Sequence, residues 1–160
     1  MLIRKLEDKD YEDCKRLFEE AYSEYLDFLM HQNPQQYQKE RKERMEVTRA
    51  RFDFYLKTRN SFVAEEDGEV VGYVASQTVN FMRDVDKLLW IEYIVVQREF
   101  RRQGIGFALL RKLIEHARRI AVDRVSTTIN PDNEASIKLH LKAGFNVDDW
   151  KSASLMIRKP

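Results

Sequence analysis

The spacing of apolar residues changes along this 160-residue chain, most clearly in its second half. Residues 88–96 (LLWIEYIVV) are mainly aliphatic, aromatic and β-branched, which is typical of a buried β-strand. After Gly106 the apolar residues recur every three or four positions, which predicts a helix that packs one face on a sheet. These positions are Leu109, Leu113, Ala117 and Ile120. Residues 97–103 (QREFRRQ) form a polar, basic loop between the predicted strand and helix.

One short strand and a first helix are predicted at the N-terminus. Residues 2–6 (LIRKL) alternate in polarity as a strand does. Asp8 or Asp10 can cap the helix that follows. Its apolar face consists of Tyr11, Cys14, Leu17, Phe18 and Ala21. Cys14 therefore fits a small core residue better than a nucleophile.

An aromatic and acidic stretch, residues 22–31, follows this helix and ends at Asn33-Pro34. Residues 35–57 then predict one long, highly charged helix with a narrow apolar stripe. Its arginines alternate with glutamates three or four positions away. This pattern favours a solvated helix face over a surface that binds nucleic acid.

A β-hairpin is predicted where residues 61–66 and 70–77 flank Asp67-Gly68, a dipeptide that favours tight turns. Residues 80–87 are expected to be a connection that leads back to the apolar strand.

The C-terminal part is predicted to contain three more strands and one helix. The strands are 124–129, 145–147 and 152–158, and the helix spans 134–143. Gly144 follows the helix as a left-handed cap.

The loop after residue 96 offers the chemistry of an anion-binding site. Backbone N–H groups at a helix start lack partners, and glycines such as Gly104 and Gly106 let a phosphate approach them. Arg98, Arg101 and Arg102 add positive charge. A dinucleotide-binding fingerprint would require a third glycine, and a P-loop would require Gly-Lys-Ser/Thr, which the chain lacks.

Composition narrows the class of protein. The chain has 28 Lys and Arg against 27 Asp and Glu. This near balance of charge does not indicate nucleic acid or a membrane as a partner. One cysteine excludes an internal disulfide, and the three histidines show no zinc-site spacing, so no metal is expected. No apolar stretch is long enough for a membrane span. We therefore expect a cytoplasmic protein with a single domain over residues 1–160.

The segment 101–106 (RRQGIG) resembles the acetyl-CoA loop of the GNAT superfamily of N-acetyltransferases, whose pattern is Arg/Gln-x-x-Gly-x-Gly/Ala. A second family pattern is matched by 133–145 (NEASIKLHLKAGF), with His140 where a tyrosine is frequent. The element order β-αα-β-β-β-α-β-α-β-β is also similar to that of the family. The resemblance implies an α/β (α+β) fold with a mixed central sheet of about six to seven strands and about four flanking helices.

The resemblance also implies how acetyl-CoA is bound. Backbone groups of Ile94, Val95 and Val96 would pair with the pantetheine arm, and the loop 101–106 would hold the pyrophosphate. Asn133 and Ser136 would lie beside the pantetheine and the thioester. These cofactor-binding residues are Ile94, Val95, Val96, Arg101, Arg102, Gln103, Gly104, Ile105, Gly106, Asn133, Ser136 and His140. The implied reaction is direct attack of a neutral amine on the thioester, with a backbone N–H near Val95 polarising its carbonyl.

Glu92 is the first catalytic candidate. A strict strand alternation places it on one face with Trp90, Ile94 and Val96, where a carboxylate needs hydrogen bonds, water or a cation. It is either a general base for an ammonium substrate or a structural carboxylate paired with an arginine. An acid is frequent at this strand position in the family, which adds weight to the base.

His140 is the second catalytic candidate. The tyrosine that it replaces would protonate the departing thiolate, and a neutral imidazole is a poor donor near pH 7. A contact with the thioester sulfur or simple packing fits His140 better than an essential acid does.

Acceptor recognition is predicted in residues 22–30, which are expected to cover the cleft opposite the CoA loop. Carboxylates and aromatic faces suit a cationic amine. The residues are Tyr22, Glu24, Tyr25, Asp27 and Phe28. Ordinary core aromatics with solvated acids are the alternative.

The sequence thus predicts an acetyl-CoA-dependent N-acetyltransferase that acts on a primary amine of a small molecule or a peptide. The alternative from another class is a module that binds acyl-CoA to sense it, without turnover. The sequence leaves both a monomer and a homodimer open.

Overall fold

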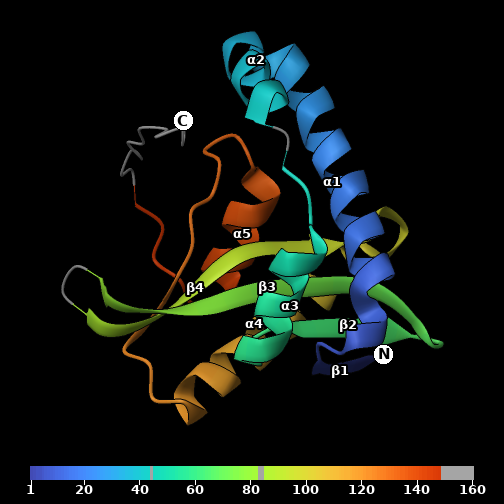
Figure 1. Ribbon diagram of the computed structural model, residues 1–160. Helices are drawn as coiled ribbons and strands as arrows, with labels where there is room; N and C mark the ends of the chain where they lie inside the picture. Colours follow the sequence, from blue (N-terminus) through green and yellow to red (C-terminus); the bar gives the residue numbers. More distant parts are fainter. Residues whose placement is uncertain (44, 83–84, 149–160) are drawn as a thin grey trace, which may run out of the picture. The chain divides into compact units, whose positions relative to one another are not determined.

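The computed structural model describes residues 1–43, 45–82 and 85–148 (Figure 1). The chain divides into two compact units, Met1–Thr128 and Ile129–Pro160, which are described separately below. The first unit contains a five-stranded sheet with the strands in the order β1-β2-β3-β4-β5. These strands are β1 (Leu2–Lys5), β2 (Phe62–Glu66), β3 (Glu69–Met82), β4 (Val85–Val96) and β5 (Arg124–Ser126). β1 to β4 pair antiparallel and β5 pairs parallel with β4, so the sheet is mixed as expected.

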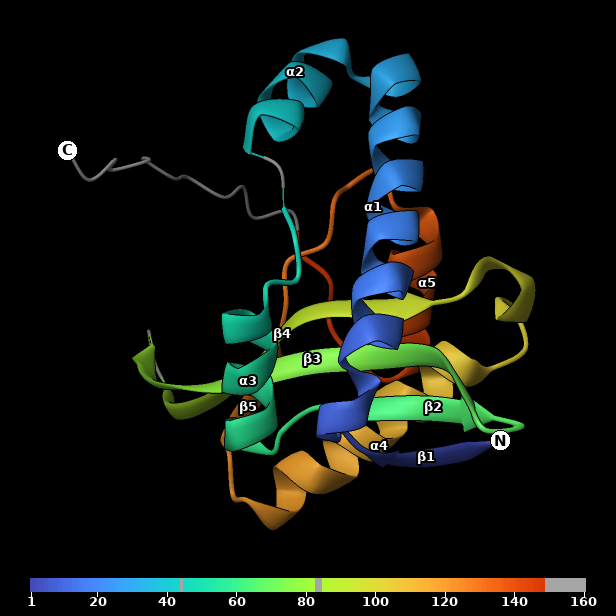
Figure 2. The ribbon, with the colours of Figure 1, turned by 45° about the vertical axis from the view of Figure 1, so that its right-hand side comes forward.

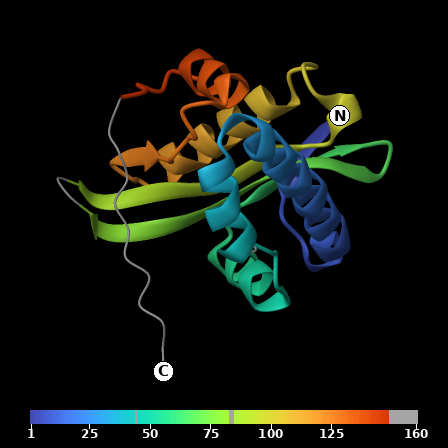
Figure 3. The ribbon, with the colours of Figure 1, turned by 90° about the horizontal axis from the view of Figure 1, so that it is seen from above.

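Helices cover both faces of this sheet. They are α1 (Tyr11–Gln32), α3 (Arg49–Thr58) and α4 (Ile105–Arg119), while α2 (Pro34–Glu43) packs against α1. In Figures 2 and 3, α1 and α3 lie on one face of the sheet and α4 lies on the other. A buried cluster joins α1 and α3 to the first face. Its members include Cys14, Leu17, Phe52, Val63, Tyr73 and Val95.

The turn between β2 and β3 shows how local sequence determines pairing. Asp67 and Gly68 have φ angles of 50° and 87°. Two consecutive positive φ values belong to a tight hairpin turn that matches the twist of its strands, and Gly adopts such values without a steric cost. The predicted hairpin is therefore confirmed.

Three expectations about the elements are wrong. The charged segment 35–57 is two helices, because Thr48 begins α3 by accepting a hydrogen bond from the Arg51 backbone N–H at 3.2 Å. Residues 80–82 and 85–87 belong to β3 and β4 and pair with each other, instead of forming a simple connection. Residues 145–147 form no strand, so the described sheet has fewer strands than expected, while the strand expected at 152–158 lies outside the described residues.

The second unit contains α5 (Glu134–Lys142). The Asn133 side chain caps its start by accepting from the Ser136 backbone N–H at 3.1 Å. Gly144 follows its end with φ 90°, and the Phe145 N–H donates to the His140 carbonyl at 3.0 Å. The left-handed glycine cap predicted here is confirmed.

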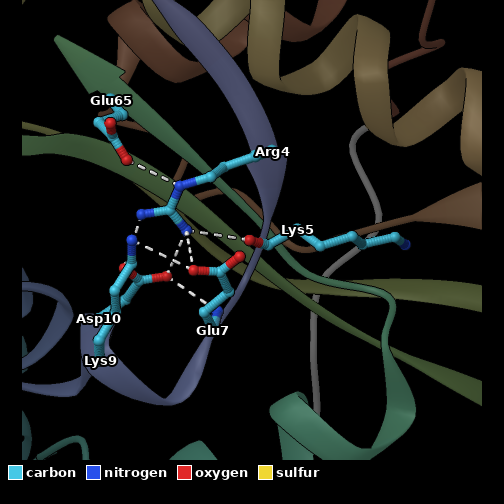
Figure 4. A network of polar contacts seen from close by, with 6 residues as sticks. All are labelled: Arg4, Lys5, Glu7, Lys9, Asp10 and Glu65. Atoms are coloured by element: carbon cyan, nitrogen blue, oxygen red, sulfur yellow. Dashed lines mark hydrogen bonds and ion pairs between the residues drawn. The ribbon is translucent and has the colours of Figure 1, made fainter. Parts of the chain in front are cut away.

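Arg4 of β1 lies at the centre of a largely buried ionic network (Figure 4). Its guanidinium donates two hydrogen bonds of 2.8 Å to the Asp10 carboxylate and one of 2.8 Å to Glu65 on β2. The Glu7 backbone N–H also donates to Asp10, whose exposed fraction is 2 %. Asp10 is the residue before α1 but makes no capping bond there, because its carboxylate serves this network instead.

A second polar cluster surrounds Lys5 on the α4 side of the sheet. The Lys5 ammonium donates to the Arg59 carbonyl, lies 4.0 Å from the Phe62 ring centre and is 3.3 Å from the His116 ring nitrogens. His116 Nε2 lies 2.9 Å from Asn60 Oδ1 and must donate to it, which leaves Nδ1 to accept from Lys5. A neutral His116 ring with its proton on Nε2 therefore serves both Asn60 and Lys5.

We expect the free energy of unfolding to depend on pH through Lys5. Burial, helped by the charges of Arg59, Arg119 and Lys112, lowers the pKa of Lys5 to about 8 from 10.5. The folded state then binds fewer protons than the unfolded state between these values, so stability should rise as pH increases from about 8 towards 10.5. Urea titrations of the wild type and Lys5→Met across this range test this, because other groups cancel in the difference. A difference independent of pH would contradict the expectation.

Candidate active site

The loop between β4 and α4 has the backbone geometry of an anion site. Arg102 and Gly104 have φ angles of 61° and 86°, and Gly104 stands directly before α4. The Ala108 N–H donates to the Gly104 carbonyl at 2.9 Å. The backbone N–H groups of the first turn, which come before Ala108, therefore have no acceptor within the helix. Alternating left-handed residues and a helix start both concentrate backbone N–H groups for a phosphate. The predicted loop geometry is thus present at residues 101–106.

Arg101 is held in place by two contacts from other elements. Its Nε donates to the Val96 carbonyl at 2.9 Å, and its Nη1 donates to Glu24 of α1 at 2.6 Å. Both side chains of this ion pair remain more than a third exposed. Glu24 therefore lies against the loop of residues 101–106, and the expectation that residues 22–30 lie opposite this loop fails at Glu24.

The edge of β4 is open next to this loop. β5 pairs with β4 only from Leu88 to Trp90, and the Thr127 hydroxyl then donates to the Ile91 carbonyl at 3.0 Å. In the described part of the chain, no strand pairs with residues 92–96 on this side. Ile94, Val95 and Val96 therefore lie on a strand edge that can accept an extended ligand as an added strand does.

Glu92 occupies a β-bulge in β4. Ala75 of β3 pairs with Tyr93 and the next residue, Ser76, pairs with Ile91, which leaves Glu92 as the extra residue. The bulge reverses the alternation of side chains along β4. Tyr93 and Val95 thus join the core beneath α1 and α3. In contrast, a γ-methyl group of Val96 lies beside Gly72 together with the side chain of Ile105, on the α4 side of the sheet.

This reversal corrects the expected placement of Glu92. Its carboxylate lies on the α3 face, because it lines a pocket with residues of α3 and accepts a hydrogen bond from the Gln77 side chain. Trp90 pairs with Gln77 and shares this face. Ile94 and Val96 follow the bulge and therefore lie on the other face, contrary to a strict alternation.

The pocket around Glu92 has a volume of about 390 Å³. It is lined by Ala50, Arg51, Phe54, Tyr55, Gln77 and Glu92. Within the described chain, Glu92 forms no ion pair, so the arginine partner expected of a purely structural carboxylate is not found there. Sequence reasoning missed the α3 residues of this pocket, because they are charged or aromatic residues in a segment that reads as a solvated helix.

A pair of tyrosines joins α3 to β4 beside the pocket. The Tyr93 hydroxyl lies 3.2 Å from the Tyr55 hydroxyl, and burial raises the pKa of both groups. Arg51 acts in the opposite direction on the pKa of Tyr93 but does not cancel the rise. Both phenols therefore stay protonated near neutral pH and act as hydrogen-bonding groups, not as bases.

The second unit holds the remaining predicted residues, Asn133, Ser136 and His140. The Asn133 side chain caps α5, and Ser136 Oγ lies 3.4 Å from His140 Nδ1. His140 Nδ1 also lies 2.8 Å from the Ser136 carbonyl and must donate to it. In the neutral ring, Nε2 is then an acceptor, and it is buried without a partner in the described chain.

This arrangement disfavours His140 as a proton donor. Its exposed fraction is 2 %, and burial lowers its pKa, partly opposed by the Ser136 carbonyl. The imidazolium that could donate is therefore scarcer near pH 7 than for an exposed histidine. The geometry fits the contact interpretation of His140.

The predicted acceptor residues on α1 have varied surroundings. Tyr22 stacks on Phe18, and its hydroxyl donates to the Glu40 carbonyl at 3.1 Å. Tyr25 lies beside Tyr22, with ring centres 6.3 Å apart. Phe28 is 40 % exposed, and the Asp27 carbonyl lies 2.8 Å from the His31 ring. No carboxylate of this segment lines the pocket around Glu92.

Cys14 is part of the core. Its side chain is fully buried, and burial raises the pKa of its thiol, so it has no thiolate character near neutral pH. The described residues contain no group of three metal-ligating side chains. They also contain no helix that is long and apolar enough to cross a membrane.

Comparison with known proteins identifies the family. Residues 11–145 match the acetyltransferase (GNAT) family, and the chain belongs to this family of acyltransferases. It is 32 % identical over 85 residues to L-2,4-diaminobutyric acid acetyltransferase of Vibrio parahaemolyticus, a match that covers 53 % of this chain and 45 % of the relative. It is 31 % identical over 88 residues to the L-amino acid N-acetyltransferase AaaT of Escherichia coli, covering 54 % and 52 %. The matches thus span about half of these curated relatives or less.

Solved structures agree in fold. An aminoglycoside N-acetyltransferase, AAC(6')-Iy in complex with CoA, superposes with a TM-score of 0.68. Its identity to this chain is 18 %, over 99 % of each chain. At this identity the likeness establishes the fold alone. The substrate has to be inferred from the chemistry of the site.

Proposed function

We propose that this chain transfers the acetyl group of acetyl-CoA to a primary amine of a small molecule or a peptide. The observation that carries the proposal is the order of three features along one short segment. Glu92 stands at a bulge, no strand of the described chain pairs with the outer edge of residues 94–96, and residues 101–106 have the backbone geometry of an anion site. The N-acetyltransferase activities of the relatives and the CoA complex of the structural neighbour support the same proposal.

Different residues would bind different parts of acetyl-CoA. Backbone N–H groups at the start of α4, with Gln103, Gly104, Ile105 and Gly106, would bind the pyrophosphate. The edge of β4 would pair with the pantetheine arm, and a backbone N–H near Val95 would polarise the thioester carbonyl. Arg101 and Arg102 would add positive charge. The family match runs through both compact units, which supports a single domain. Asn133, Ser136 and His140 stay candidates for cofactor binding through the family pattern that they match.

Glu92 would act as the general base. It would accept a proton from the ammonium form of the acceptor, directly or through water. The neutral nitrogen would attack the carbonyl carbon, a C–N bond would form, and the C–S bond would break. The nitrogen would then release its second proton to solvent, which leaves the neutral amide. CoA would leave as a thiolate that takes a proton from solvent, with His140 only in contact.

A thiol-release assay with acetyl-CoA and a panel of primary amines tests the proposal. We expect free CoA to appear at a rate that depends on the amine, together with an acetylated product of matching mass. The alternative, a module that senses acyl-CoA, predicts CoA binding by calorimetry without release for any amine. That outcome would overturn the proposal while leaving the family assignment intact.

A further inference from the structure

The pocket around Glu92 contains charges of both signs that do not neutralise each other. Glu92 comes from β4, and Arg51 comes from the first turn of α3. The two side chains line the same pocket but form no ion pair with each other. Phe54 and Tyr55 supply aromatic surface beside them.

Arg51 is exposed at the start of α3, a position that favours an anion beside it. The start of a helix carries partial positive charge, and the first turn of α3 holds no acidic residue. Its neighbour Arg49 is neutralised by Asp8 and Asp53. Among the described residues, no carboxylate forms an ion pair with Arg51. Its guanidinium lies near the Tyr93 phenol.

Anion binding at this position would be favoured by two independent features. The guanidinium can donate two parallel hydrogen bonds to a carboxylate, and the helix start adds its dipole. Ala50, which also lies in the first turn, lines the pocket as well. The α3 end of the pocket is thus suited to a negative group, and the Glu92 end is suited to an ammonium group.

We propose that the acceptor carries a carboxylate as well as an amine, as a free amino acid does, and that Arg51 binds this carboxylate while Glu92 receives the amine. The inference rests on the proposed function. A volume of about 390 Å³ accommodates a ligand of amino-acid size. The aromatic side chains then contact the aliphatic part of the acceptor between its two charges.

The test compares amino acids with their carboxamides as acceptors. The carboxamide keeps the size and the amine but lacks the negative charge. Its amine is also less basic, so more of it is neutral, and a preference for the acid cannot come from the supply of neutral amine. We expect the wild type to prefer the acid in kcat/KM by about tenfold or more, the range of a charge-assisted hydrogen bond.

Variants of α3 assign this preference to Arg51. Arg51→Gln should bring the ratio of acid to carboxamide close to one, mainly through a higher KM for the acid. Arg51→Lys should keep part of the preference, because it keeps the charge without the paired donors. Arg49→Gln, in the same turn but outside the pocket, should leave the ratio as in the wild type. KM for acetyl-CoA should not change in any of them.

Failure of this inference is distinct from failure of the proposed function. Equal use of acids and carboxamides by the wild type, or a preference that survives Arg51→Gln, would overturn the carboxylate site while acetyl transfer stands. A complete absence of amine-dependent thiol release would overturn both proposals.

Discussion

Glu92→Gln should lower kcat by about a hundredfold or more with an ammonium acceptor near neutral pH, within the range of general acid–base catalysis. The substitution preserves size and keeps a partner for Gln77, whose side chain bonds Glu92 in the wild type. It removes the group that would take the proton from the acceptor. Steady-state kinetics with an amine found in the panel measure the loss, and KM for acetyl-CoA should stay near the wild-type value.

The pH dependence separates a base from a structural carboxylate. If Glu92 serves as a base, the acidic limb of the wild-type profile that reports its ionisation should vanish in Glu92→Gln. The variant should then recover activity as rising pH supplies neutral amine from solution. Glu99→Gln, an exposed change in the turn after β4, is the matched control. A Glu92→Gln protein with near wild-type kcat would show that the carboxylate is structural.

Arg4→Met should lower the free energy of unfolding by about 3–5 kcal/mol, the usual cost of removing one partner from a buried ion pair. The exposed fraction of the Arg4 side chain is 15 %, and that of Asp10 is 2 %. Loss of the guanidinium would leave the Asp10 carboxylate with the Glu7 backbone N–H but without a counter-charge. Urea unfolding of the wild type and the variant measures the difference.

Two further variants show whether the cost comes from the buried charge. Arg16→Met removes an exposed arginine that pairs with Asp13 and Glu20 on α1, and it should cost less than about 1 kcal/mol. Arg4→Met combined with Asp10→Leu removes both charges and should recover much of the loss. An Arg4→Met variant as stable as Arg16→Met would contradict a buried ionic network.

Much of the fold was predictable because its signals are local. Asp67-Gly68 marks a tight turn between alternating strands, and the structure places a hairpin there. Gly144 adopts the left-handed angle that was predicted for a glycine cap at the end of a helix. The break at Thr48 was missed because charges spaced three or four apart continue through it and imitate one long helix.

The pocket around Glu92 was not predictable because it depends on pairing between distant segments. The bulge at Glu92 is a property of the β3–β4 register, and one extra residue changes the face of every side chain after it. Arg51 comes to the same pocket from a helix 41 positions earlier in the chain. Glu24 and Arg101 meet although they are separated by 77 positions.

The sequence by itself determined the strand, the glycine-containing loop and the helix at residues 88–110, and with them the family. These features depend on backbone preferences and apolar spacing within a few residues, which short motifs encode directly. Only the tertiary structure decided which face of β4 carries Glu92, which helix supplies its neighbours and which end of the pocket is positive. Those properties arise from strand register and helix packing, where contacts between residues far apart in sequence outweigh local preference.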